Sequence, residues 1–275
     1  MSRLRHYAHE LVLAVILIAA LAVISQLTDK FLTTDNLLNQ GRLMAEVALV
    51  ALPMTYIIVT GGIDLSVGSI MGLTAITLGY SWKNLGLPLE LAIPFALAIG
   101  TFAGFLNGLL ITRVKVPPLI MTLATLALYR GLAEGISRAR SVRGYPDWFF
   151  VLGQGGVFGV PTQLWLVFIA VIVFAYVLAR TTFGRALYAI GHNETAARFS
   201  GIPVDRIKLR IYTISGFMAA LAGWIFVSRV STTRSDMGTG LELDVIAAVV
   251  LGGTSIFGGI GTVLGTVLGF TSFSC

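Results

Sequence analysis

The chain alternates between long apolar runs and short polar or glycine- and proline-rich breaks, without the two-residue alternation of a half-buried strand. A helix that crosses a bilayer needs about 20 mostly apolar residues, so runs of this kind indicate membrane-spanning helices. Several runs are shorter than that, as expected of helices broken by glycine, and we expect about eight to ten spans. The predicted spans are Leu11–Leu27, Leu43–Thr60, Val67–Trp82, Leu87–Ile111, Pro117–Ala133, Leu164–Ala179, Ile211–Ser228, Leu243–Phe257 and Gly258 to the end.

Composition supports this interpretation. Of the 275 residues, 56% are hydrophobic and 12% are charged. A soluble domain has about 25% charged residues, so this chain cannot cover a water-facing surface. The sequence therefore predicts an all-α polytopic membrane helix bundle with a single transmembrane domain over residues 1–275.

The basic residues predict the orientation of the chain. The net charge is +6, from 19 Lys plus Arg against 13 acidic residues, and an excess of this kind in a membrane protein lies in cytoplasmic loops rather than indicating a nucleic-acid partner. The densest cluster lies in residues 180–210, which we therefore expect in the cytoplasm together with the N-terminus. The longest outer connection, Glu134–Gln163, is then either a linker folded over the helix ends or a surface for a partner. The basic residues of the dense cluster are Arg180, Arg185, Arg198, Arg206, Lys208 and Arg210.

Several chemistries are missing from the sequence. The single cysteine is Cys275, and the three histidines, His6, His9 and His192, are too scattered for a metal cluster. No Gly-Lys dipeptide is present, so the chain has no P-loop with which to bind ATP. We expect no catalytic residue, no cofactor and no metal site in this chain.

Two sets of glycines recur at every fourth residue. Such a strip on a helix lets a second backbone approach closely, which replaces the hydrophobic driving force that lipid does not supply. We interpret both sets as helix-packing seams. They are Gly100, Gly104 and Gly108, and Gly261, Gly265 and Gly269.

A polar segment interrupts the apolar sequence at Thr60–Ser69. A charge at the bilayer centre costs about 2.5–3.5 kcal/mol, so Asp64 should lie near an interface, line a wet cavity or have a partner. Asp64 and Ser66 either cap the helix that resumes near Val67 or take part in a translocation pathway. The pathway candidates here are Gly61, Gly62, Asp64, Ser66 and Ser69.

A faint internal repeat accompanies this segment. Gly61, Gly62 and Gly68 have the same spacing as Gly252, Gly253 and Gly259. Transporters are often built from two halves with interrupted helices at matching places, so the pattern favours two weakly related halves. Gly252 and Gly253 are therefore further pathway candidates.

The other ionisable residues in or beside apolar runs are Glu46, Arg130, Glu242 and Asp244. A Glu–Arg pair across helices would neutralise two of them. The sequence does not say which residues pair.

Residues Asn193 to Gly201 predict a short helix, with Asn193 as its N-cap, Glu194 in its first turn and Gly201 as its C-terminal stop. Two interpretations are open. The helix is a rigid element that fits a groove on a partner, or it lies on lipid headgroups through Arg185, Arg198 and Arg206.

Three long motifs together resemble the permease subunits of bacterial ABC importers for ribose, xylose, arabinose, galactose, rhamnose and related monosaccharides. The resemblance implies an inner-membrane permease that works by alternating access. Its implied partners are a separate cytoplasmic ABC ATPase, a periplasmic sugar-binding protein and a second permease subunit. The motifs are GGIDLSVGS (61–69), FGRALYAIGHNETAARFSGI (183–202) and LDVIAAVVLGGTSIFGG (243–259).

Within the second motif, the segment from Thr195 to Gly201 is similar to the ATPase-coupling element of ABC importers, with Thr195 where Glu is common. The chain also ends soon after the last glycine seam, where members of the family usually continue, so we expect that it is truncated. The alternative function is an ion-coupled secondary carrier or a facilitative channel for a small polar solute. The implied coupling residues are Asn193, Glu194, Thr195, Ala196, Ala197, Arg198 and Gly201.

Overall fold

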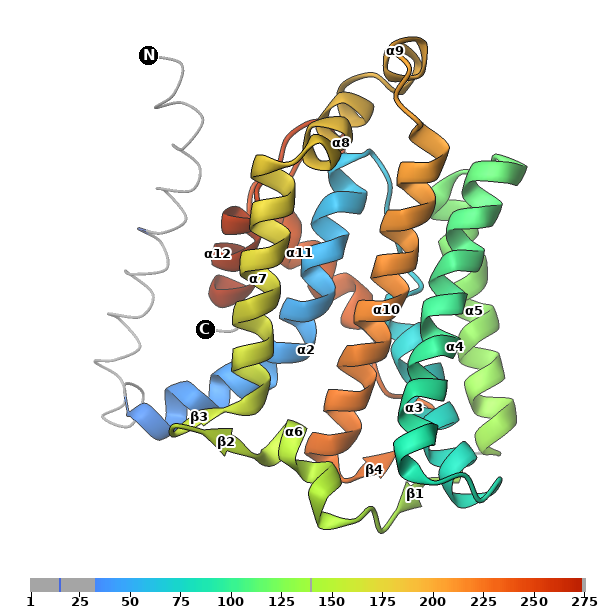
Figure 1. The fold of residues 1–275 in the computed structure, drawn as a ribbon, viewed down its shortest axis with the longest axis vertical. Coiled ribbons are helices and arrows are strands. Elements are labelled where there is room, and N and C mark those ends of the chain that lie inside the picture. The colour runs from blue at the N-terminus through green and yellow to red at the C-terminus, as the bar shows by residue number, and fades with distance from the viewer. Residues whose placement is uncertain (1–14, 16–32, 139, 274–275) are drawn as a thin grey trace.

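The computed structural model describes residues 15, 33–138 and 140–273. The described part of the chain is an all-α bundle with eight apolar helices that correspond to predicted spans (Figure 1). The first predicted span, Leu11–Leu27, lies outside the described residues. The eight helices are α2 (Thr34–Val59), α3 (Val67–Lys83), α4 (Leu89–Leu109), α5 (Pro118–Ser137), α7 (Thr162–Arg180), α10 (Val204–Val230), α11 (Leu241–Leu251) and α12 (Val263–Phe273).

Five of these helices, α2, α4, α5, α7 and α10, are long and apolar enough to cross a membrane. A π-helical turn, Leu110–Val114, extends α4. Helix α11 has 11 residues, too few for a complete span, and the irregular segment 252–262 joins it to α12. The prediction of continuous helices over Leu243–Phe257 and from Gly258 onward is therefore wrong at this segment, where Gly253, Gly258 and Gly259 adopt positive φ angles that end a helix.

Helix α2 begins at Thr34, nine residues before the predicted Leu43. A similar difference is found at α10, which begins seven residues before the predicted Ile211. Its first turns are amphipathic: Val204, Ile207 and Ile211 are buried, whereas Arg206 and Arg210 are exposed. An apolar run cannot reveal a helix whose first two turns have one polar face.

The two ends of the bundle differ. At one end, here called the α9 end, lie α8 (Thr182–His192) and α9 (Glu194–Phe199) (Figure 1). At the opposite end, the strand end, β1 (Val142–Arg143) pairs with β4 (Thr232–Thr233), and β2 (Gly156–Val157) pairs with β3 (Val160–Pro161). The short helices η2 (Asp147–Phe150) and α6 (Val151–Gln154) complete this end.

The connection between α5 and α7 is folded over the helix ends, one of the two interpretations of that segment. The Ser228 hydroxyl of α10 donates to the Phe149 carbonyl and accepts from the Gly153 amide, at 2.7 and 2.8 Å. These bonds fix the connection against the buried end of α10.

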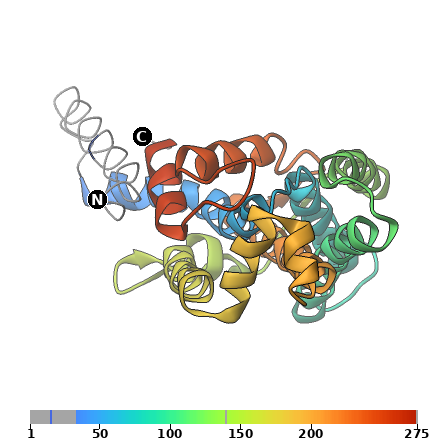
Figure 2. The same ribbon diagram turned by 90° about the horizontal axis from the view of Figure 1, so that it is seen from above.

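Helix α10 runs beside α4 along the predicted glycine seam (Figures 1 and 2). Gly104 faces the Tyr212 carbonyl and Gly216, and Gly100 faces Ala220, at positions where a Cβ atom would collide. In the second set, Gly265 and Gly269 of α12 lie against Gly252 and Ala248. Gly261 precedes α12 and faces Thr254 instead, so its placement on the last helix was wrong.

We expect the variant Gly104→Ala to be less stable than the parent by about 1–3 kcal/mol, because α4 and α10 must move apart to admit the methyl group. The control is Gly131→Ala in α5, where a Cβ would have no atom within 4 Å. Thermal unfolding of both detergent-solubilised variants measures the difference. Equal stability of the two would show that the seam is not close-packed.

Candidate functional site

Helix α9 has the predicted caps. The Asn193 side chain accepts a hydrogen bond from the Ala196 amide at 2.9 Å. At the other end Gly201 has a φ of +80°, and the Ile202 amide donates to the Ala197 carbonyl at 3.1 Å. A left-handed glycine closing a helix in this way defines where the helix stops.

An ion-pair network connects α9 to its neighbours. Arg198 contacts Glu194 at 2.8 Å and Asp205 at 2.6 Å, and Lys208 contacts Glu194 at 2.5 Å. Lys115, which lies just before α5, contacts Asp205 at 2.9 Å. Helix α9 is thereby joined both to the start of α10 and to the connection between α4 and α5.

The network determines the charges on α9. Partial burial raises the pKa of Glu194, but the hydrogen bonds and charges of Lys208 and Arg198 together outweigh it and hold that pKa below its ordinary value. Hydrogen bonds to Asp205 and Glu194 raise the pKa of Arg198. The Arg198 guanidinium is therefore engaged in ion pairs within the protein.

The exposed surface of α9 includes one large apolar side chain. Thr195 and Ala196 are exposed, Ala197 is buried, and the Phe199 side chain is 89% exposed. A lone exposed Phe is common on proteins, but this one ends a rigid helix at the tip of the molecule. Helix α9 therefore ends in an exposed aromatic side chain at the tip of the bundle.

Two irregular segments, 60–66 between α2 and α3 and 252–262 between α11 and α12, are here called the helix breaks. Helix α8, which precedes α9, touches both. The Gly259 amide donates to the Val59 carbonyl at 2.8 Å, so the α11–α12 segment meets the end of α2. A Cβ on Gly191 of α8 would collide with both of these groups. The Tyr188 hydroxyl of α8 also donates to the Gly261 carbonyl at 2.6 Å. We call this contact the α8 joint.

The predicted pathway residues around Asp64 are fully buried. Asp64 accepts hydrogen bonds from the Ser66 amide and hydroxyl, at 3.0 and 2.6 Å, and from the Ser215 hydroxyl of α10 at 3.0 Å. Asn107 of α4 donates to the Ser66 hydroxyl at 2.7 Å, and Ser69 donates to the Ser66 carbonyl. The expected partners of Asp64 are therefore hydroxyl and amide groups that tie α3 to α4 and α10.

The other pathway candidates are only partly brought together. Gly61, with φ of +76°, lies against Phe257 and Gly258 of the second break. Gly252 packs instead against Gly265 of α12. The two breaks thus meet through residues 257–259 rather than through Gly252 and Gly253.

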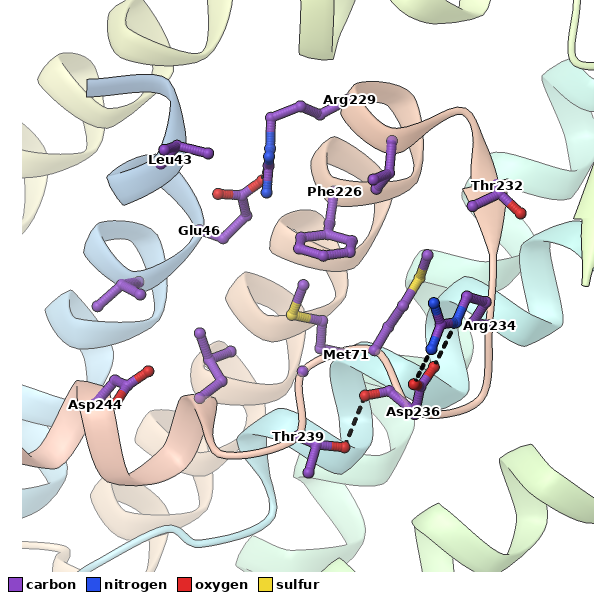
Figure 3. Close-up of a pocket in the computed structure, with 15 residues that line it drawn as sticks. Leu43, Glu46, Met71, Phe226, Arg229, Thr232, Arg234, Asp236, Thr239 and Asp244 are labelled. Atoms are coloured by element: carbon purple, nitrogen blue, oxygen red, sulfur yellow. Dashed lines mark hydrogen bonds and ion pairs between the residues drawn. The ribbon is translucent and has the colours of Figure 1, made fainter. Parts of the chain in front are cut away.

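A cavity of about 410 Å³ opens at the strand end between α2, α3, α10 and α11 (Figure 3). We call it the outer pocket. Glu46 and Arg229 point toward one another from α2 and α10, with 2.9 Å between Oε1 and Nε. Arg234 and Asp236 form a second pair at the opposite wall. Asp244 of α11 completes the charged lining.

The outer pocket was not predicted from the sequence. Glu46 and Asp244 are recognisable as charges in apolar runs, but Arg229 reads as a loop residue because it lies at the end of α10. Arg130, a second candidate cation, instead donates to the Ser235 and Met237 carbonyls at 2.6 and 2.8 Å and so holds the loop that edges the pocket. No local sequence pattern indicates that residues so far apart in the chain lie around one cavity.

Comparisons with known proteins agree on one family. A family model described as "Branched-chain amino acid transport system / permease component" matches residues 34–274. The chain is 41% identical over 257 residues to a ribose import permease protein of Haemophilus influenzae, covering 92% of this chain and 79% of that protein. It is 36% identical over 274 residues to an autoinducer 2 import system permease protein of Yersinia enterocolitica, covering 98% and 82%. No solved structure matches.

Proposed function

The chain belongs to the family of branched-chain amino acid transport system permease components, and we propose that it is the membrane-spanning subunit of an ATP-driven (ABC) importer for a monosaccharide. The relatives named as permeases for ribose and autoinducer 2 support a small polar solute. They are transport subunits rather than enzymes. Their description as import-system permeases favours a subunit of a multi-component importer over an ion-coupled carrier or channel.

The observation that carries the proposal is the rigid structure of the α9 end. Helix α9 is capped at both ends, bound by the ion-pair network and tipped by the exposed Phe199. A rigid knob of this kind can transmit a displacement, whereas a free loop would absorb it. We assign it as the site where a separate cytoplasmic ABC ATPase docks, through Thr195, Ala196 and Phe199.

The proposed orientation follows from this docking site. The α9 end faces the cytoplasm of the bacterium, as the basic residues of the 180–210 segment favour. The strand end then faces the periplasm, where a sugar-binding protein delivers the solute. The N-terminus lies on the cytoplasmic side of the inner membrane.

A second permease subunit completes the proposed importer. Leu119, Leu123 and Leu128 of α5, and Phe168 and Ile172 of α7, expose large apolar side chains. Lipid covers such faces in a membrane, and a second copy or a paralogue covers part of them in a dimer.

Transport proceeds in this proposal by alternating access. Closure of the ATPase displaces α9, and α8 carries that displacement to the two helix breaks through the α8 joint. The breaks bear Gly61, Gly62 and Asp64 on one side and Gly252 and Gly253 on the other. Their rearrangement would free the Asp64 cluster, with Ser66 and Ser69, to line the pathway.

We expect cells that lack this chain to lose uptake of radiolabelled D-ribose, and cells with a catalytically dead partner ATPase to lose it equally, because the chain has no P-loop of its own. Complementation with the intact gene is the control. Uptake by the purified chain in liposomes under a proton gradient without ATP would contradict the proposal in favour of the carrier.

A further inference from the structure

The outer pocket contains a buried carboxylate oxygen that the protein leaves without a partner. Glu46 is 2% exposed, and its Oε1 atom pairs with Arg229. Within the described residues, its Oε2 atom has no hydrogen-bond partner. A buried charged oxygen is costly when unpaired, so this atom needs a donor from water or from a ligand in the pocket.

The pocket has the size and lining of a small-molecule site. Its volume of about 410 Å³ lies within the range of about 300–1,000 Å³ that is typical of such sites. Phe226, Met71 and Met237 form apolar walls between the charged groups. The cavity opens at the strand end, on the side where the proposed function puts the periplasm.

The charges of the lining disfavour an anionic ligand. Both guanidinium groups are already paired, Arg229 with Glu46 and Arg234 with Asp236. Asp244 has no ion pair in the described structure, so the pocket has a surplus of acceptors and no unpaired cation. A free amino acid would place its carboxylate among these acceptors without a counter-charge.

We infer that the outer pocket binds a neutral polyhydroxylated solute of the monosaccharide class on its way into the permease. A hydroxyl group both donates and accepts, so it can donate to Glu46 Oε2 or Asp244 and accept from Arg229 without unbalancing either ion pair. The inference rests on the proposed function and deepens it. It also separates this chain from the amino-acid substrate that the family description names.

Cysteine labelling of the full chain tests the site. In a Cys275→Ser background, Thr239→Cys puts a single thiol on an exposed residue of the pocket lining, and Leu85→Cys puts one at the strand end outside the pocket. We expect both to react with a membrane-impermeant maleimide in intact cells. D-ribose at about ten times its Kd should slow labelling of Thr239→Cys about tenfold and leave labelling of Leu85→Cys unchanged. L-leucine at the same concentration should slow neither.

A charge variant tests the role of Glu46. Adding Glu46→Gln to the Thr239→Cys chain should abolish protection by D-ribose, while the labelling rate without sugar stays unchanged. Glu90 is an exposed carboxylate at the same end, and the control change Glu90→Gln should preserve protection. If Glu46→Gln does not reach the membrane, loss of protection in Asp244→Asn supports the inference and full protection overturns it.

Three further outcomes overturn the inference. They are failure of Thr239→Cys to react from outside while Leu85→Cys does, reaction without protection by D-ribose, and protection by L-leucine. Ribose uptake that still requires this chain and its ATPase would show, in each case, that the proposed function holds and only the site is wrong.

Discussion

The variant Gly201→Val is expected to weaken binding of the partner ATPase about tenfold and to reduce sugar uptake accordingly. Gly201 holds a φ of +80°, and a Cβ placed on it would have no atom within 4 Å, so the main cost of valine is backbone strain. That strain is about 1–2 kcal/mol in the left-handed region, and about 1.4 kcal/mol corresponds to a factor of ten. Relief of the strain requires α9 to end differently, which displaces Phe199.

Gly86→Val is the matched control. Gly86 has a φ of +70°, also has no atom within 4 Å of a Cβ, and follows α3 at the strand end. It carries the same backbone strain at the opposite end of the bundle from α9. Co-purification of the ATPase and radiolabelled uptake are the measurements. Equal losses in both variants would show a general folding defect, and normal ATPase binding in Gly201→Val would remove α9 from the docking site.

The features that the sequence predicted are those encoded by neighbouring residues. The apolar runs located the spans because lipid imposes one pattern on every helix that crosses it. The cap Asn193 and the stop Gly201 located α9 because capping is a local hydrogen-bond requirement. The glycines of the α4 seam were recognisable because their spacing places them on one face.

The features that it did not predict depend on which distant segments meet. Glu46 and Arg229 are 183 residues apart, and the Asp64 carboxylate receives a bond from Ser215, 151 residues later. Polarity marked Asp64 as unusual and Glu46 as costly, but only the packing of α2, α3 and α10 supplies their partners. The same limit hid the outer pocket, whose walls come from four helices.

The α8 joint separates two steps that uptake alone cannot distinguish: docking of the ATPase and transmission of its movement. Docking, in our proposal, depends on α9, which lies at the tip of the bundle and ends at Phe199. Transmission, in our proposal, depends on Gly191, where α8 meets Val59 and Gly259. A change confined to Gly191 should therefore leave binding intact and block transport.

We expect Gly191→Ala to retain the partner ATPase and to lose at least about tenfold in uptake. Its Cβ would collide with the Val59 carbonyl and the Gly259 amide, so α8 must shift or their 2.8 Å hydrogen bond must break, at a cost of about 1–3 kcal/mol. Gly135→Ala in α5, where a Cβ meets nothing within 4 Å, is the control. ATPase co-purification, ATP hydrolysis and uptake are measured on the same preparations. If uptake falls only as much as ATPase binding falls, Gly191 supports α9 and does not transmit its movement. If the ATPase still binds and hydrolyses ATP but uptake is lost, the α8 joint is the link between the ATPase and the helix breaks.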